Sequence, residues 1–168
     1  MKIYTKKGDL GQTDLMFKRV SKADLHISVN GAIDEAMAFL LMSKHAIEQQ
    51  DVKDDLDQIH DHLFSICYEI VLNDINKYKI SKDNIDWLEG RIDYYDKKLE
   101  PLSEFIKLDQ TVAASWLNLA RVTIRRAERE LVLLASKDAI NPLTLSYINR
   151  LSDYLFTLGR VFDELKER

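Results

Sequence analysis

Apolar residues near the C-terminus recur in steps of three and four positions, a spacing that places them on one face of an α-helix. The set consists of Ile148, Leu151, Leu155, Leu158, Phe162 and Leu165. A helix with one apolar stripe needs other helices to cover that stripe. The pattern therefore predicts a C-terminal helix over about 143–167 that packs within a bundle.

Most of the preceding chain has few helix-breaking residues. The 168 residues include two prolines and five glycines, and long stretches without either residue favour helices. We expect four further helices, near 26–49, 51–73, 81–97 and 108–136. Short connections between long amphipathic helices favour antiparallel neighbours. The predicted fold is all-α, an up-and-down five-helix bundle over 26–168 with an extended N-terminal segment over 1–25.

Composition argues against several classes of protein. With 46% hydrophobic and 31% charged residues, the chain suits a single globular domain over 1–168 and is too apolar for disorder. The net charge of -4 argues against nucleic-acid binding, which normally needs a broad basic excess. No run approaches about 18 apolar residues, and the N-terminus lacks a signal peptide's apolar stretch, so we expect no membrane insertion. The single cysteine, Cys67, suits a reducing cytoplasm.

Arginines crowd into the stretch "LARVTIRRAERELV". Arg121, Arg125 and Arg129 follow one another at a spacing of four residues, and like charges at this spacing destabilise a helix. The planar guanidinium group suits carboxylates and phosphates. Spacing alone leaves two interpretations open. The row is either a site for an anion or a solvated face whose charges Glu128 and Glu130 partly offset.

Glycines, hydroxyl groups and lysines gather near the N-terminus in "YTKKGDLGQTDL". Glycines let a backbone approach a ligand closely, and hydroxyl and ammonium groups complement phosphate oxygens. The residues concerned are Thr5, Lys6, Lys7, Gly8, Gly11 and Thr13. The stretch lacks the Walker A pattern, so it fits either a phosphate cradle or an ordinary loop.

Two further polar pairs lie on expected helices. Asn149 and Asp153 are one helical turn apart in "YINRLSDYLF", where they could bind sugar hydroxyls or hold an arginine in place. Asp34 and Glu35 come early in the first helix, where carboxylates interact favourably with the helix dipole. Either carboxylate could also pair with an arginine across a bundle or subunit interface.

Five segments, taken together and in this order, resemble the PduO-type ATP:cob(I)alamin adenosyltransferases. They are "YTKKGDLGQT" at 4–13, "SKAD" at 21–24, "GAIDE" at 31–35, "LARVTIRRAERELV" at 119–132 and "YINRLSDYLFTLGR" at 147–160. The resemblance implies a five-helix bundle, usually a homotrimer with active sites between subunits. It also implies transfer of the 5′-deoxyadenosyl group of ATP to the cobalt of cob(I)alamin, with release of triphosphate.

The resemblance assigns ATP binding to the N-terminal segment. The residues that would wrap ATP are Thr5, Gly8, Asp9, Gly11 and Thr13, with Lys22 on the phosphates. The implied partners are ATP, cob(I)alamin, further copies of the chain and a flavoprotein reductase.

The helices would supply the remaining site residues. By the resemblance, Arg125 would contact the triphosphate, Glu128 would help to organise ATP and Mg²⁺, and Asn149 would line the nucleotide site. Arg121 would pair with Asp34 across the subunit boundary.

Phe105 falls at the family position that packs under the corrin and displaces the lower cobalt ligand. After it, the family commonly has an aliphatic residue followed by Pro-Gly-Gly, whereas this chain has Leu108, Asp109 and Gln110. This departure keeps a second function open, that of a diverged trimeric ATP-binding or regulatory protein without corrinoid chemistry. A helical interaction module without a small ligand is a third interpretation.

Overall fold

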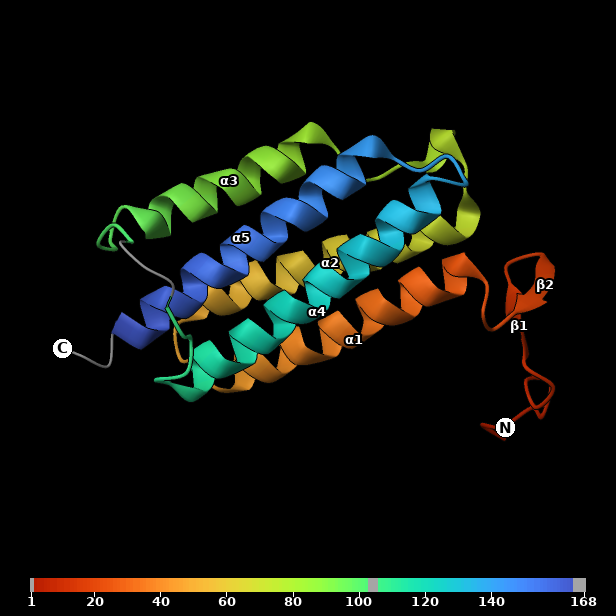
Figure 1. The fold of residues 1–168 in the computed structure, drawn as a ribbon, viewed down its shortest axis with the longest axis horizontal. Coiled ribbons are helices and arrows are strands. Elements are labelled where there is room, and N and C mark those ends of the chain that lie inside the picture. Colours follow the sequence, from red (N-terminus) through yellow and green to blue (C-terminus); the bar gives the residue numbers. More distant parts are fainter. Residues whose placement is uncertain (1, 103–105, 165–168) are drawn as a thin grey trace.

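The computed structural model describes residues 2–102 and 106–164. Five long helices account for most of them: α1 (Leu25–His45), α2 (Gln50–Leu72), α3 (Lys82–Asp96), α4 (Val112–Ala135) and α5 (Pro142–Glu164), with a short 3-10 helix, η1 (Ile75–Lys77), after α2. Successive long helices run in opposite directions (Figure 1). The predicted up-and-down five-helix bundle is confirmed.

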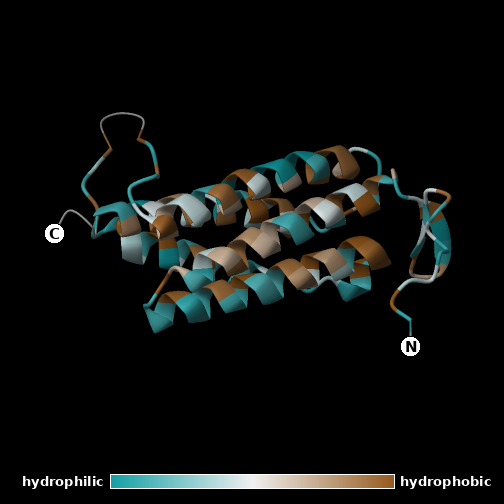
Figure 2. Ribbon diagram, turned by 90° about the horizontal axis from the view of Figure 1, so that it is seen from below, coloured by the Kyte–Doolittle hydropathy of each residue, from teal (hydrophilic) through white to brown (hydrophobic). Residues whose placement is uncertain are grey.

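The helices enclose one continuous hydrophobic core. The main contacts join α1 with α4, α4 with α5, α3 with α5 and α1 with α2. Hydrophobic positions recur along each helix between hydrophilic ones (Figure 2). On α5 the predicted stripe is buried from Ile148 to Phe162, while Leu165 lies outside the described residues.

α1 is long and apolar enough to cross a membrane, judged by length and composition only. In the bundle, Val29, Ile33 and Leu40 of this helix are buried in the shared core. The core helix of a globular bundle passes the same test. Sequence inspection did not single out this helix, because its apolar residues are interrupted by polar ones.

The segment that was expected to be a loop contains a β-hairpin. Strands β1 (Gln12–Leu15) and β2 (Lys18–Ser21) pair antiparallel, with Gln12 opposite Ser21 and Leu15 opposite Lys18. Each strand has only four residues; β2 is mostly exposed, and Leu15 at the end of β1 is buried. Met16, in the turn, has a φ of 49° although it is not glycine. The sequence here has neither a long alternating hydrophobic pattern nor a typical turn residue, so it did not predict this hairpin.

α4 begins at Val112, four residues after the predicted start at 108. The Thr111 hydroxyl caps the helix by accepting a hydrogen bond of 3.0 Å from the backbone N–H of Ala114. The Asp163 carboxylate accepts hydrogen bonds from the backbone N–H groups of Gln110 and Thr111, at 3.1 and 3.0 Å. A cap and a tertiary contact therefore hold the preceding residues out of the helix.

α1 ends at His45, although the pattern predicted helix to residue 49. Ile47, in the connection that follows, is 2% exposed and belongs to the core. A buried apolar residue in a turn prolongs the hydrophobic pattern beyond the helix itself, which explains the overestimate.

Candidate functional site

The arginine-rich helix α4 has one buried face and one accessible face. Its buried line consists of Ala120, Thr123, Ala127, Leu131 and Leu134. Arg125, Arg126 and Arg129 are exposed, and Arg121 is half-buried. The apolar line packs the helix into the bundle, and the arginines consequently project along its border.

Arg121 and Arg125 are crowded positive charges. The Arg121 guanidinium donates to the side-chain oxygen of Asn118 from Nε at 3.1 Å and from Nη2 at 2.8 Å. Burial, and secondly the charge of Arg125, lower the pKa of Arg121. Within residues 2–102 and 106–164, neither arginine forms an ion pair with a carboxylate. The pair is therefore suited to an anionic ligand or to a carboxylate from another chain.

Arg126 has a structural partner inside the chain. Its guanidinium forms an ion pair with Glu35, which joins α4 to α1. Asp34, the neighbouring residue, is exposed. Its carboxylate makes no hydrogen bond or ion pair with any other residue that the structure describes. The pairing of Arg121 with Asp34 across a subunit boundary stays a prediction, and among the described residues neither side chain has an ion-pair partner.

Glu128 and Asn149 come together from two helices. The Asn149 side-chain amide on α5 donates a hydrogen bond of 3.0 Å to the Glu128 carboxylate on α4. Asn149 is exposed and Glu128 is half-buried. Two residues assigned separately to the nucleotide site thus form one polar pair, one helical turn from Arg125.

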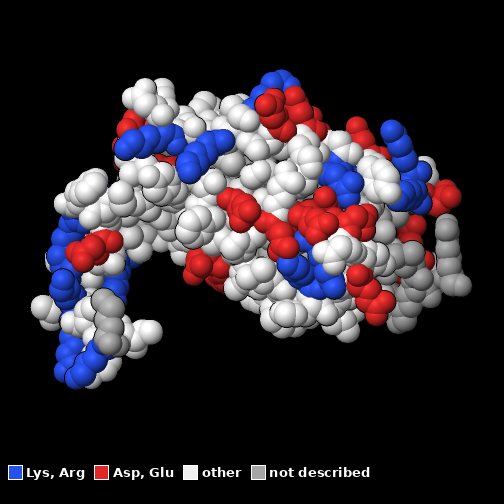
Figure 3. Space-filling view, turned by 180° about the vertical axis from the view of Figure 1, so that it is seen from behind, with Lys and Arg blue, Asp and Glu red and all other residues white. Residues whose placement is uncertain are grey.

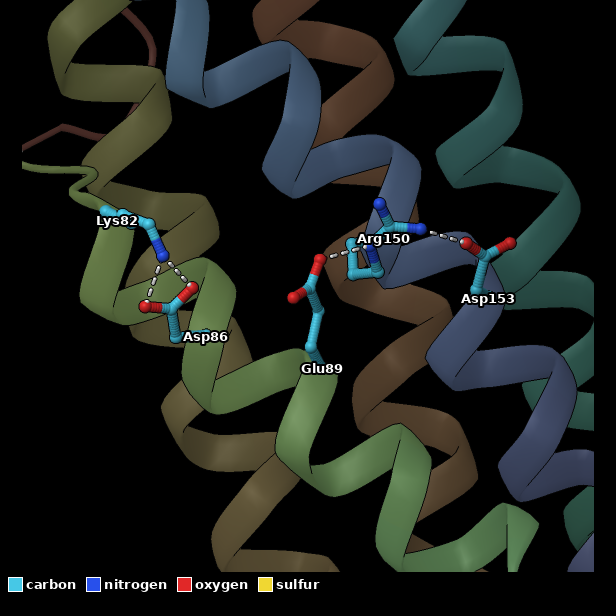
Figure 4. A network of polar contacts seen from close by, with 5 residues as sticks. All are labelled: Lys82, Asp86, Glu89, Arg150 and Asp153. Atoms are coloured by element: carbon cyan, nitrogen blue, oxygen red, sulfur yellow. Dashed lines mark hydrogen bonds and ion pairs between the residues drawn. The ribbon is translucent and has the colours of Figure 1, made fainter.

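Asp153 does not take part in that pair. Arg150 lies between two carboxylates, since it donates to Glu89 and to Asp153 at 3.0 Å each. Figure 4 shows this group bridging α3 and α5, beside a separate contact between Lys82 and Asp86. Of the two roles considered for Asp153, the structure favours holding an arginine.

The N-terminal segment is basic although the whole chain is acidic. Residues 2–22 contain six basic side chains, namely Lys2, Lys6, Lys7, Lys18, Arg19 and Lys22, against two acidic ones, Asp9 and Asp14. Lys and Arg side chains gather on this projecting part of the molecule (Figure 3). A local concentration of positive charge favours binding of an anion there.

Backbone hydrogen bonds bring Gly8, Gly11 and Lys22 together. The Gly11 N–H donates to the Gly8 carbonyl at 3.1 Å, and the Lys22 N–H donates to the Gly11 carbonyl at 2.9 Å. Gly11 has a φ of 76°, a conformation that glycine adopts without the steric cost of a Cβ. Thr5 and Asp9 are exposed beside this turn, and Thr13 is half-buried on β1.

The structure does not bring the N-terminal residues to the arginine row within one chain. The N-terminal segment projects beyond the end of the bundle, away from the middle of α4 (Figure 1). No hydrogen bond or ion pair joins described residues 2–22 to α4 or α5. Each chain therefore presents two separate halves of the expected nucleotide site.

A recess lies beside Arg121, at the end of the bundle where α4 begins. Its walls consist of Ile106, Lys107, Leu108 and Asp109 from the connection before α4, Asn118 and Arg121 from α4, and Phe156 from α5. Phe105, the residue assigned to the corrin, lies outside the described residues. Sequence reasoning missed Asn118 and Phe156. Their helical spacings, three residues before Arg121 and seven after Asn149, were the available signal.

The described residues contain no cluster of three or more His, Cys, Asp or Glu side chains that could hold a metal ion. Glu128 is a single carboxylate close to the arginine row. Mg²⁺ is commonly bound by one or two protein carboxylates together with substrate phosphates. Glu128 therefore fits a Mg²⁺ ion that arrives with ATP better than a metal ion held by protein groups alone.

Comparisons with known proteins point to one family. A family model described as cobalamin adenosyltransferase matches residues 3–162. A corrinoid adenosyltransferase of Bacillus subtilis is 36% identical, over 96% of this chain and 86% of its own. The corrinoid adenosyltransferase PduO of Salmonella typhimurium is 37% identical over 97% of this chain, which spans 50% of that relative.

Solved structures show the same fold. A variant of a PduO-type ATP:corrinoid adenosyltransferase from Lactobacillus reuteri, complexed with cobalamin and ATP, superimposes with a TM-score of 0.92. The two sequences are 33% identical, and the match covers 99% of this chain and 93% of the other. Family model, relatives and fold agree, and the chain belongs to the cobalamin adenosyltransferase family.

Proposed function

We propose that the protein transfers the 5′-deoxyadenosyl group of ATP to the cobalt of cob(I)alamin, forming adenosylcobalamin and releasing triphosphate. The observation that carries the proposal is the pair of arginines, Arg121 and Arg125, which have no carboxylate partner among the described residues. Arg125 lies one turn from Glu128, which contacts Asn149. In a member of this family, Arg125 suits a polyphosphate leaving group and Arg121 suits a carboxylate of a neighbouring subunit.

The chemistry asks the protein to position two substrates and to stabilise a leaving group. Cob(I)alamin is itself a strong nucleophile, so alignment of its cobalt with the ribose C5′ supplies much of the catalysis. Arg125 would stabilise charge on the departing triphosphate, and its exposure on the accessible face of α4 supports this role. Mg²⁺, bound through phosphate oxygens and Glu128, would neutralise part of the same charge.

The nucleotide half of the site is proposed to be shared by two subunits. The basic N-terminal segment, with Thr5, Gly8, Asp9, Gly11, Thr13 and Lys22, would wrap ATP against the arginine row of a neighbouring chain. The projection of this segment beyond its own bundle supports the assignment (Figure 1). We also propose a homotrimer, which the family resemblance implies, with Arg121 paired to Asp34 of the adjacent subunit.

The corrinoid half is proposed to lie at the recess beside Arg121. Phe105 would exclude the lower cobalt ligand, which makes the preceding cob(II)alamin easier to reduce, and a flavoprotein reductase would supply the electron. Leu108 and Asp109 line the recess in place of the family's usual Pro-Gly. A cytoplasmic location belongs to this proposal, because the described chain has one free cysteine and the reaction needs a reduced corrinoid.

The test uses purified protein with ATP, Mg²⁺ and chemically reduced cobalamin, so that no reductase is needed. The expected result is adenosylcobalamin, followed by its absorption spectrum, together with triphosphate. A protein that gains thermal stability with ATP but forms no adenosylcobalamin would instead be the diverged ATP-binding protein, which the unusual Leu108-Asp109-Gln110 sequence favours. A protein whose stability ATP does not change would be a helical interaction module.

A further inference from the structure

The connection between α3 and α4 is held at both ends by the last two turns of α5. Near its start, Nη2 of Arg160 donates to the Glu100 carbonyl at 2.6 Å. Near its end, Asp163 accepts from the backbone N–H groups of Gln110 and Thr111. Arg160 and Asp163 are 6% and 8% exposed. Two buried side chains of α5 thus determine where this connection leaves and rejoins the bundle.

Between these anchors, Leu108 packs directly on Gly159. Leu108 is 4% exposed. A Cβ atom added at Gly159 would lie 2.9 Å from Cδ1 and 3.6 Å from Cδ2 of Leu108, and the first distance is shorter than real Cβ contacts. A glycine inside a helix costs about 1 kcal/mol relative to alanine. Here the missing side chain makes room for the leucine.

The same leucine forms part of the recess beside Arg121. Phe156, which lies one turn before Gly159 on α5, and Arg121 line the recess together with Leu108. A shift of Leu108 away from α5 would therefore change the shape of the recess directly. No hydrogen bond connects Leu108 or Gly159 with the N-terminal segment within the described residues.

We propose that Leu108 and Gly159 are a matched pair of positioning residues that sets the wall of the corrinoid site. The inference rests on the proposed function, since that function identifies the recess as the corrinoid half. The leucine stands where relatives commonly have a proline. Gly159 leaves room on α5 for the buried leucine side chain, while Arg160 and Asp163 hold the backbone on either side of Leu108. The pair thereby determines corrinoid binding without contributing to ATP binding.

The experiment compares the parent with Gly159→Ala, Leu108→Ala and the double variant, using chemically reduced cobalamin. Gly159→Ala is expected to raise the KM for the corrinoid about tenfold, because the added Cβ, 2.9 Å from Cδ1 of the buried Leu108, would force that side chain away from α5 and change the recess. Its KM for ATP stays within about twofold of the parent. Leu108→Ala raises the corrinoid KM less, because it removes contacts without adding a clash.

The double variant distinguishes positioning from a general packing defect. Removing the leucine side chain relieves the clash, so the corrinoid KM of the double variant should fall to that of Leu108→Ala. Gly90→Ala on α3 is the matched control, since nothing lies within 4 Å of a Cβ added there. Thermal unfolding of each variant checks that the bundle is intact. If Gly159→Ala folds poorly, Leu108→Ala by itself still tests whether Leu108 shapes the wall of the corrinoid site.

Three results would overturn the inference while leaving the proposed function standing. They are an unchanged corrinoid KM in both single variants, a parallel rise of the KM for ATP, and a double variant no better than Gly159→Ala. A parent that forms no adenosylcobalamin would refute the proposed function and this inference together. The activity of the parent therefore separates the two kinds of failure.

Discussion

The side-chain amide of Asn149 on α5 donates a hydrogen bond of 3.0 Å to the carboxylate of Glu128 on α4. The contact spans 21 residues of sequence and joins the two helices beside the arginine row. It also orients the Glu128 carboxylate, the group proposed to help hold Mg²⁺. An amide suits this position, because it can donate to the carboxylate without adding charge next to a triphosphate.

Asn149→Asp tests this relationship. A second carboxylate facing Glu128 would replace a hydrogen bond with repulsion between like charges, and it would also repel the triphosphate. We expect kcat/KM for ATP to fall about 100-fold, and about tenfold for Asn149→Ala. Asp153→Asn, one turn further along α5, is the control, because Asp153 contacts Arg150 instead. Equal effects at positions 149 and 153 would contradict the assignment.

Arg125→Ala removes the charge proposed to stabilise the leaving group. Because that interaction would strengthen in the transition state, kcat and kcat/KM should both fall, by about 100-fold or more. The variant should keep its thermal stability, since Arg125 is exposed and makes no ion pair within the described residues. Lys82→Ala controls for loss of one positive charge on α3, where Lys82 forms an ion pair with Asp86. A variant as active as the parent would exclude Arg125 from catalysis.

The helices could be predicted from the sequence, because each one buries a stripe whose period is visible locally. Ile148 to Phe162 on α5 illustrate this, since every member of the predicted stripe within the described residues is buried. The start of α4 could not be placed in the same way. It depends on Asp163, which lies 52 residues further along than Thr111 in the sequence. Helix periods are local, whereas such contacts exist only in the folded bundle.

The candidate site, too, could be predicted only where its signal was local in the sequence. The crowding of like charges at Arg121 and Arg125 was visible from their spacing. Burial, which the sequence did not show, is the main reason that the pKa of Arg121 is lowered, and the charge of Arg125 adds to it. The contact of Glu128 with Asn149 needed the relative placement of two helices. The hairpin could not be predicted from the sequence, because β1 and β2 are short and largely polar. Only the resemblance to a family assigned Thr13 on β1, and its neighbours before the hairpin, to ATP.

Gly11→Ala tests the N-terminal segment as the nucleotide half of the site. Gly11 has a φ of 76°, and a residue with a Cβ loses about 1–2 kcal/mol in this conformation. If ATP binding needs the observed turn, affinity should fall about five- to thirtyfold. The bundle should keep its unfolding temperature, because the segment forms no hydrogen bond with α4 or α5 among the described residues. Isothermal titration with ATP and Mg²⁺ measures the affinity.

Gly90→Ala on α3 is a suitable comparison for Gly11→Ala, since a Cβ at residue 90 meets nothing within 4 Å. It should leave the affinity for ATP unchanged. If Gly11→Ala bound ATP as tightly as the parent, the turn between Gly8 and Lys22 would not belong to the nucleotide site.

His62 should make the stability of the bundle depend on pH. Its Nδ1 lies 2.9 Å from the Tyr147 hydroxyl, and the Asn84 amide nitrogen lies 3.0 Å from its Nε2. Burial lowers the pKa of His62 below its ordinary value of 6.5, and the charge of Asp61 only partly opposes this. An Nε2 atom that accepts from an amide donor cannot also carry a proton, so the geometry agrees with a neutral ring.

The sign of the dependence follows from proton binding. Below pH 6.5 the unfolded chain takes up a proton at His62 that the folded chain resists, so folding loses stability as the pH falls. Above pH 6.5 the neutral His62 makes its full contribution to the free energy of unfolding. Urea unfolding between pH 5 and 7.5 should therefore show the parent losing stability relative to His62→Gln as the solution becomes more acidic. His45→Gln, at an exposed position, should follow the parent, and a parent–His62→Gln difference that stays constant across this range would refute the prediction.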